Sequence, residues 1–206
     1  AAMMYEVAWV RLLIPVLGSS IYSFSVMLVS FISGITIGSL IVSAIIQRVK
    51  DLFKLLAFCQ LGIVVSMIAA LPLYTRVPFY FWHVANVLNR TDAAYPVFLV
   101  IQFVFAFLIM IVPTIFLGMT LPVASRIAAR SVSILGRSVG NVFSLNTIGT
   151  VLGSLTAGLI LIPLVGVHHT IEIGVGFNLM MGLLVLFYGA SFTRVRKITY
   201  STGVVL

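Results

Sequence analysis

Long runs of apolar residues, separated by short groups of charged ones, dominate the pattern along the chain. A helix needs about 20 predominantly apolar residues to cross the hydrocarbon core of a bilayer. Five charge-free runs reach that length, and the first is long enough to contain parts of two helices. These runs cover residues 12–47, 55–75, 93–125, 138–171 and 173–193.

Breaks between the runs predict an all-α membrane protein, a bundle of six transmembrane helices in one domain over residues 1–206. Pro15 and the Gly-Ser-Ser at 18–20 end the first helix, and Pro163 with Gly166 ends the fifth. The stretch 75–94 is rich in aromatic residues and is expected to lie on the membrane surface. The predicted helices are 1–17, 21–46, 52–74, 95–124, 138–164 and 168–192.

The composition excludes a water-soluble fold. Hydrophobic residues make up 62% of the chain and charged residues only 8%, whereas soluble domains carry about 25% charged residues. The net charge of +8 would suggest nucleic acid on a soluble protein. Here the basic residues stand at helix ends, as the positive-inside rule requires, so no nucleic-acid partner is expected.

The distribution of basic residues predicts the orientation. Arg48 and Lys50 follow the second helix, further arginines follow the fourth, and three basic residues follow the sixth. The connections on the other side carry fewer. Both termini are therefore expected in the cytoplasm, and we expect a bacterial inner-membrane protein. The first apolar segment is short, so the natural N-terminus is expected upstream of Ala1.

Glycines predict where helices pack closely. Gly34 and Gly38 have the G-xxx-G spacing that lets another backbone approach. The predicted helix 138–164 carries many small residues, Gly149, Gly153 and Gly158 among them, and its small-residue face is expected to be the most tightly packed in the bundle.

Glu6 and Arg11 are charged residues inside the first predicted helix. Such groups are costly in a bilayer and usually face protein or water. Glu6 is expected near mid-membrane, where it either binds a cation or substrate or makes a structural hydrogen bond. Ser144 and Asn146 are predicted to be its neighbours.

Other polar groups at membrane depth complete the candidate intramembrane site. Arg11 can snorkel outward or reach Glu172, near the outer end of the sixth helix. Asn146 and Asn178 are expected to make hydrogen bonds between helices.

No catalytic, metal or cofactor site is expected. His83, His168 and His169 are too few and too badly spaced for a zinc site. The single cysteine, Cys59, lies in an apolar run and is expected to be a small buried residue.

Several motifs together resemble the membrane-bound spermidine synthase-like family. They are MYEVAWVR at 4–11, LGSSIYSFS at 17–25, PTIFLGMTLP at 113–122, GRSVG at 136–140, NTIG at 146–149 and GSL at 153–155. The resemblance implies a membrane region related to half of a major facilitator transporter, often fused to a cytoplasmic aminopropyltransferase-like domain. No Gly-rich phosphate or adenosine motif follows Lys197, so the chain itself is expected not to be an enzyme.

Two hypotheses follow for function. The first is a membrane module that binds or moves polyamines or other small cations. The second is a non-catalytic structural subunit of a larger membrane complex. Half of a facilitator-type transporter needs a second half, so the expected partners, besides the lipid bilayer and a small cationic ligand, are a second copy or other membrane subunits.

Overall fold

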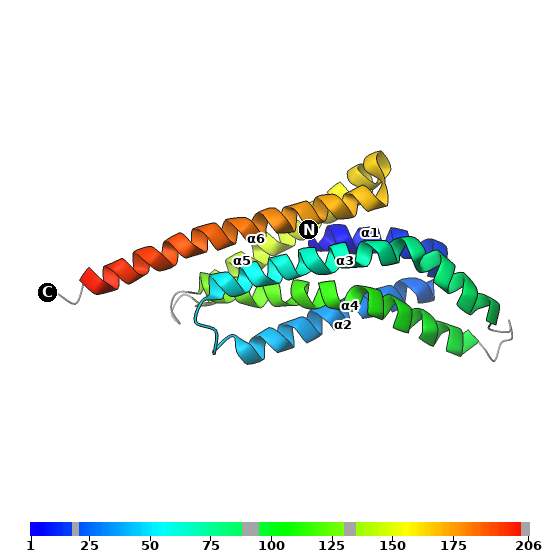
Figure 1. The fold of residues 1–206 in the computed structure, drawn as a ribbon, viewed down its shortest axis with the longest axis horizontal. Helices are drawn as coiled ribbons and strands as arrows, with labels where there is room; N and C mark the ends of the chain where they lie inside the picture. The colour runs from blue at the N-terminus through cyan, green and yellow to red at the C-terminus, as the bar shows by residue number, and fades with distance from the viewer. Residues whose placement is uncertain (18–20, 88–94, 130–134, 203–206) are drawn as a thin grey trace.

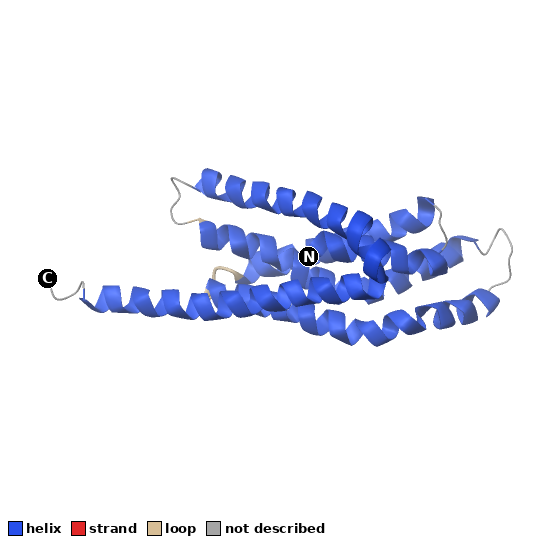
Figure 2. Ribbon diagram, turned by 90° about the horizontal axis from the view of Figure 1, so that it is seen from above, coloured by secondary structure: helices blue, strands red, loops and turns tan. Residues whose placement is uncertain are grey.

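The computed structural model describes residues 1–17, 21–87, 95–129 and 135–202. Within those ranges every regular element is a helix, and the long helices run side by side in an elongated bundle (Figures 1 and 2). The elements are α1 (Ala2–Leu17), α2 (Ile21–Ile45), α3 (Leu52–Val87), α4 (Tyr95–Ala128), α5 (Leu135–Leu155), the π-helical segment η3 (Thr156–Leu161) and α6 (Ile162–Thr202).

Four helical runs in the described part are long and apolar enough to cross a membrane. They are Ile21–Ile45, Leu52–Tyr74, Phe103–Ala128 and Gly136–Gly189. Several long apolar helices of this kind indicate a membrane protein, because water-soluble bundles keep a polar face on each helix.

Gly166 breaks the last of these runs. It is the one residue with positive φ (83°) among those described, a conformation that glycine adopts without steric cost. The Thr170 hydroxyl donates a 2.7 Å hydrogen bond to the Gly166 carbonyl. Figure 1 shows the chain reversing between η3 and the long part of α6, where the sequence predicts a break.

Residues 75–87 do not form the separate helix that the sequence predicts, but their expected position at the membrane surface stays a prediction. Helix α3 continues without interruption to Val87, and residues 88–94 lie outside the described ranges. Pro78 removes one backbone hydrogen bond, which can bend a helix without ending it. The last part of α3 bends away from the axis of the bundle in Figure 1.

The closest helix approach joins α2 to α4. A Cβ built on Gly34 would collide with the Thr114 side chain, and one on Gly38 would collide with the Ile115 carbonyl. On the α4 side of the same contact, a Cβ on Gly118 would collide with the backbone of Ile35. Small residues on both helices therefore allow backbone contact, as the spacing of Gly34 and Gly38 predicts.

The expectation that the small residues of 138–164 form the tightest interface is wrong. A Cβ added to Gly140 or Gly149 would meet no neighbouring atom within 4 Å, and one on Gly153 or Gly158 would make only ordinary contacts with α1. Most residues from 136 to 149 are exposed, so no other helix covers the small residues of this part of α5. Gly140 and Gly149 lie nine residues apart and point in opposite directions, so they do not form one small-residue face either.

Candidate functional site

Two buried hydrogen bonds fix the rotation of α1 within the bundle. The Asn178 side-chain amide on α6 donates to the Tyr5 hydroxyl at 2.7 Å. The Trp9 indole N–H donates to the Tyr74 hydroxyl on α3 at 2.8 Å. Tyr5 and Trp9 are one helical turn apart and both are fully buried, so α1 is held at two successive turns.

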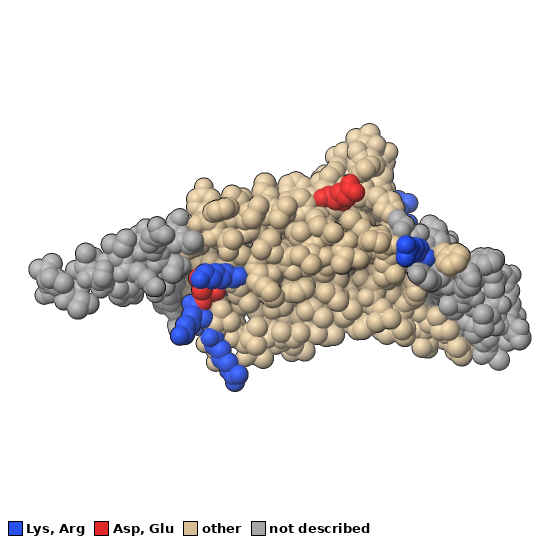
Figure 3. Space-filling model, viewed as in Figure 1, with Lys and Arg blue, Asp and Glu red and all other residues tan. Residues whose placement is uncertain are grey.

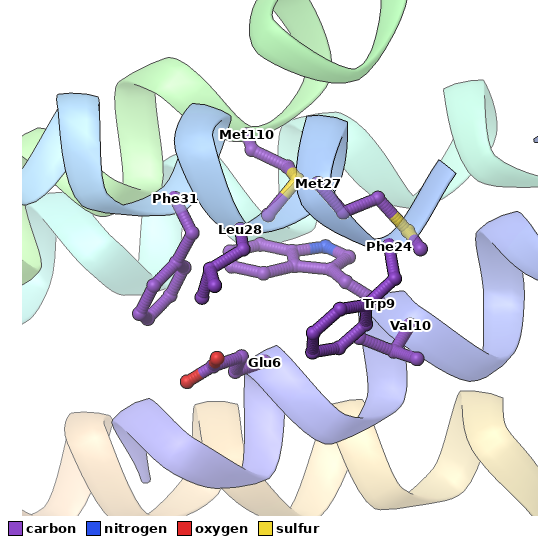
Figure 4. Close-up of a pocket in the computed structure, with 8 residues that line it drawn as sticks. All are labelled: Glu6, Trp9, Val10, Phe24, Met27, Leu28, Phe31 and Met110. Atoms are coloured by element: carbon purple, nitrogen blue, oxygen red, sulfur yellow. The ribbon is translucent and has the colours of Figure 1, made fainter. Parts of the chain in front are cut away.

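With α1 held in this way, Glu6 faces a small pocket between α1 and α2. Figure 4 shows that side chains of α2, Phe24, Leu28 and Phe31 among them, point towards α1, which carries Glu6 and Trp9. The cavity volume is about 10 Å³, room for roughly one water molecule. The lining residues are Glu6, Trp9 and Val10 of α1, Phe24, Met27, Leu28 and Phe31 of α2, and Met110 of α4.

Aromatic rings form much of the pocket wall. The rings of Trp9 and Phe31 are 6.1 Å apart at 66°, an edge-to-face arrangement. The polar edge of Trp9 is occupied by Tyr74. Phe24 adds a third ring, which is 49% exposed. Aromatic faces carry partial negative charge and attract cations within about 6 Å of the ring centre.

Glu6 is the single ionisable group in this pocket. It is half-buried, and its carboxylate makes no hydrogen bond or ion pair with any described residue. A carboxylate removed from water without a partner is strongly disfavoured. At membrane depth it needs a proton, water, a cation or a group from another molecule.

The structure does not bring Ser144 or Asn146 to Glu6. Helix α1 lies against Gly153 at Met3 and against Gly158 at Val7. This register places Asn146 about eleven residues below the level of Glu6, roughly 16 Å along the helix. Ser144 and Asn146 are both exposed on α5, and the prediction that they are neighbours of Glu6 is wrong.

The remaining candidates are separated from the pocket. Glu172 is paired with His169, whose Nδ1 lies 2.8 Å from a carboxylate oxygen, and not with Arg11. Arg11 is exposed. The Asn178 side chain makes the hydrogen bond between helices that its position predicts. The Asn146 side chain makes none with a described residue, and its backbone carbonyl accepts only from the Thr150 hydroxyl within α5.

On the face seen in Figure 3, Lys and Arg lie toward the two ends of the described bundle, and the surface between them shows an acidic patch but no Lys or Arg. Lys54 and Asp51 form an ion pair at 3.7 Å at one end. In the described ranges no group of three or more His, Cys, Asp or Glu residues could hold a metal ion. Cys59 is fully buried beside Met119 and Val123.

Sequence reasoning missed the aromatic wall of the pocket, although a signal for it exists. Phe24, Leu28 and Phe31 recur at i, i+4 and i+7, which places them on one face of α2. Trp9 follows Glu6 by three positions on α1, so the two share a face. Neither pattern shows from the sequence that the two faces meet.

Comparisons with known proteins identify no relative of this chain. No protein-family model, no curated protein and no solved structure matches this chain.

Proposed function

We propose that this chain is an integral membrane module that binds a small cation at Glu6. The observation that carries the proposal is the lone carboxylate of Glu6, which has no described partner and faces a pocket lined by aromatic rings and thioethers. Buried ionisable groups in membrane helices commonly mark substrate or ion pathways. The resemblance to the spermidine synthase-like family supports a cationic ligand and makes polyamines the first compounds to test.

The proposed topology has six membrane passes with both termini in the cytoplasm of a bacterium. It is supported by the reversal at Gly166, which divides Gly136–Gly189 into two antiparallel helical segments that would each supply one pass. Helix α1, with 16 residues, would supply the remaining pass. Six passes correspond to half of a facilitator-type transporter, so movement of the cation across the membrane would require a second copy or a second subunit.

Calorimetric titration of the purified protein in nanodiscs tests cation binding. Spermidine, ammonium and potassium chlorides are titrated into the wild type, Glu6→Gln and Glu172→Gln. Glu6→Gln keeps the size of the side chain but removes its charge, so we expect at least about tenfold weaker binding. Glu172→Gln is the matched control, because Glu172 is exposed and paired with His169, and it should leave the affinity unchanged.

Two results would contradict the proposal: no cation binds to the wild type, or Glu6→Gln binds as tightly as the wild type. Either would leave Glu6 without a role as a cation ligand.

A structural subunit of a larger complex is the second candidate function. The exposed amide of Asn146 and the open surface at Gly149, three residues further on and on the same side of α5, favour it, because another helix could cover this face. Purification in mild detergent distinguishes the two functions. Foreign subunits recovered in stoichiometric amounts support the structural role, whereas an assembly of this chain alone that binds cations supports the first proposal.

A further inference from the structure

We propose that the Glu6 pocket takes the head of a primary ammonium ion that carries a single charge and an apolar tail. This inference rests on the proposed cation-binding function and deepens it. It separates such lipophilic amines from polyamines and from inorganic ions, both of which the Glu6 carboxylate alone would also attract.

The number of carboxylates in the pocket favours a ligand with a single positive charge. Glu6 is the one acid in the pocket. The other acids among the described residues already have partners, Asp51 with Lys54 and Glu172 with His169. A second ammonium group on the ligand would therefore enter apolar surroundings without a counter-ion, which opposes binding.

The size of the cavity favours a primary ammonium head. A volume of about 10 Å³ holds roughly one water-sized group. An –NH₃⁺ group has that size, whereas a tetraalkylammonium group is several times larger. The three N–H donors of such a head can reach the Glu6 carboxylate while its positive charge faces the rings of Trp9 and Phe31.

The chemistry of the wall disfavours inorganic cations. Apart from the carboxylate of Glu6, the lining side chains are hydrocarbon, aromatic, indole or thioether. Hard cations prefer a shell of several oxygen ligands, which this wall does not supply. Carbon atoms next to the nitrogen of an alkylammonium ion would instead pack against Leu28, Met27 and Met110.

The pocket also has a path for an apolar tail. Phe24 is 49% exposed, so one wall of the pocket continues onto the outer surface of α2. Ile21 and Ile32 extend this surface with large exposed apolar side chains. An alkyl chain can lie along it while the head stays beside Glu6.

The test compares hexylammonium with hexamethylenediammonium, spermidine and potassium. The first two have the same alkyl length and differ in the second charge. The protein is purified in phosphatidylcholine nanodiscs and carries Trp82→Phe, so that Trp9 is its single tryptophan. Affinity is measured by calorimetry and occupancy by Trp9 fluorescence.

We expect hexylammonium to bind at least about tenfold more tightly than the other three cations. Glu6→Gln should remove this binding. Phe24→Leu keeps an apolar side chain but removes a ring, and should weaken hexylammonium binding about two- to fivefold. Phe177→Leu is the matched control, since Phe177 is also 49% exposed but lies on α6 outside the pocket, and it should change nothing.

The outcomes separate this inference from the function on which it rests. If spermidine, hexamethylenediammonium or potassium binds as tightly as hexylammonium and still depends on Glu6, the inference is overturned and the cation site stands. If no cation binds in a Glu6-dependent way, the proposed function fails and the inference fails with it. Hexylammonium binding that survives Glu6→Gln would be partition into the bilayer and would also overturn the inference.

Discussion

The side-chain amide of Asn178 donates a 2.7 Å hydrogen bond to the Tyr5 hydroxyl. This bond joins α6 to α1 through two residues that are 173 positions apart in the chain. Both residues are buried. The ring of Tyr5 also lies against Gly174, one helical turn before Asn178 on α6, where an added Cβ would come within 2.7 Å of the ring. The same contact that buries Tyr5 therefore turns Glu6, the next residue, towards α2.

Tyr5→Phe should destabilise the protein by about 1 kcal/mol, because it leaves the Asn178 amide without its partner. Asn178→Leu should cost a similar amount, and the double variant should cost less than the sum of the two. The resulting coupling energy is measured by reversible unfolding in mixed detergent micelles and should be roughly 0.6–1.7 kcal/mol. Pairing Tyr5→Phe with Thr36→Val should give additive effects, because Thr36 is exposed and its hydroxyl bonds only the Ile32 carbonyl within α2. Additivity for Tyr5 and Asn178 would mean that the bond contributes nothing.

Gly118→Ala should destabilise the bundle, since the new methyl group would meet the backbone of Ile35 on α2. Overpacking of this kind costs about 1–3 kcal/mol. Gly140→Ala is the matched control on α5, where nothing lies within 4 Å, and it should be neutral or stabilise by up to about 1 kcal/mol. Thermal unfolding of both variants in detergent measures the difference. Equal effects of the two substitutions would show that α2 and α4 are not in backbone contact at this point.

Single cysteines should report opposite sides of the membrane at the two ends of the bundle. In a Cys59→Ala background, Lys50→Cys lies in the connection between α2 and α3, and Val165→Cys lies beside the turn at Gly166. An impermeant maleimide added to intact bacterial cells should modify only the second, because the basic connections are expected in the cytoplasm. Permeabilised cells provide the control in which both are modified. Modification of Lys50→Cys from outside would reverse the proposed orientation.

Much of the helical order could be predicted from the sequence because membrane helices are specified by the length of their apolar runs. The starts of α2, α3 and α4 and the break at Gly166 need only local information. The end of α3 does not follow from local information, because a proline such as Pro78 can either end a helix or bend one that continues.

The surroundings of Glu6 could not be predicted in the same way. The depth of a residue follows from its position in one helix, but its neighbours depend on the register between helices. The contact of Val7 with Gly158 sets that register, and it moves Asn146 well below Glu6. Which face of α2 meets α1 also depends on long-range packing, so the aromatic wall at Phe24 and Phe31 emerges only in three dimensions.

Removal of the Glu6 carboxylate should make the empty protein more stable. The lining side chains around Glu6 are apolar or aromatic, and no described residue pairs with the carboxylate. Glu6→Leu replaces it with a side chain suited to the pocket, so we expect a gain of about 1–3 kcal/mol in the free energy of unfolding. Glu6→Gln should give a smaller gain, because the amide is polar but uncharged.

The same variants separate a ligand site from a structural one. A cation that binds only the folded protein raises its stability by mass action. Hexylammonium should therefore raise the melting temperature of the wild type and leave that of Glu6→Leu unchanged. Glu172→Leu is the control for loss of an acid outside the pocket and should keep the response to hexylammonium. A melting temperature of Glu6→Leu clearly below that of the wild type without ligand would show instead that the carboxylate holds the bundle together, and that its role is structural.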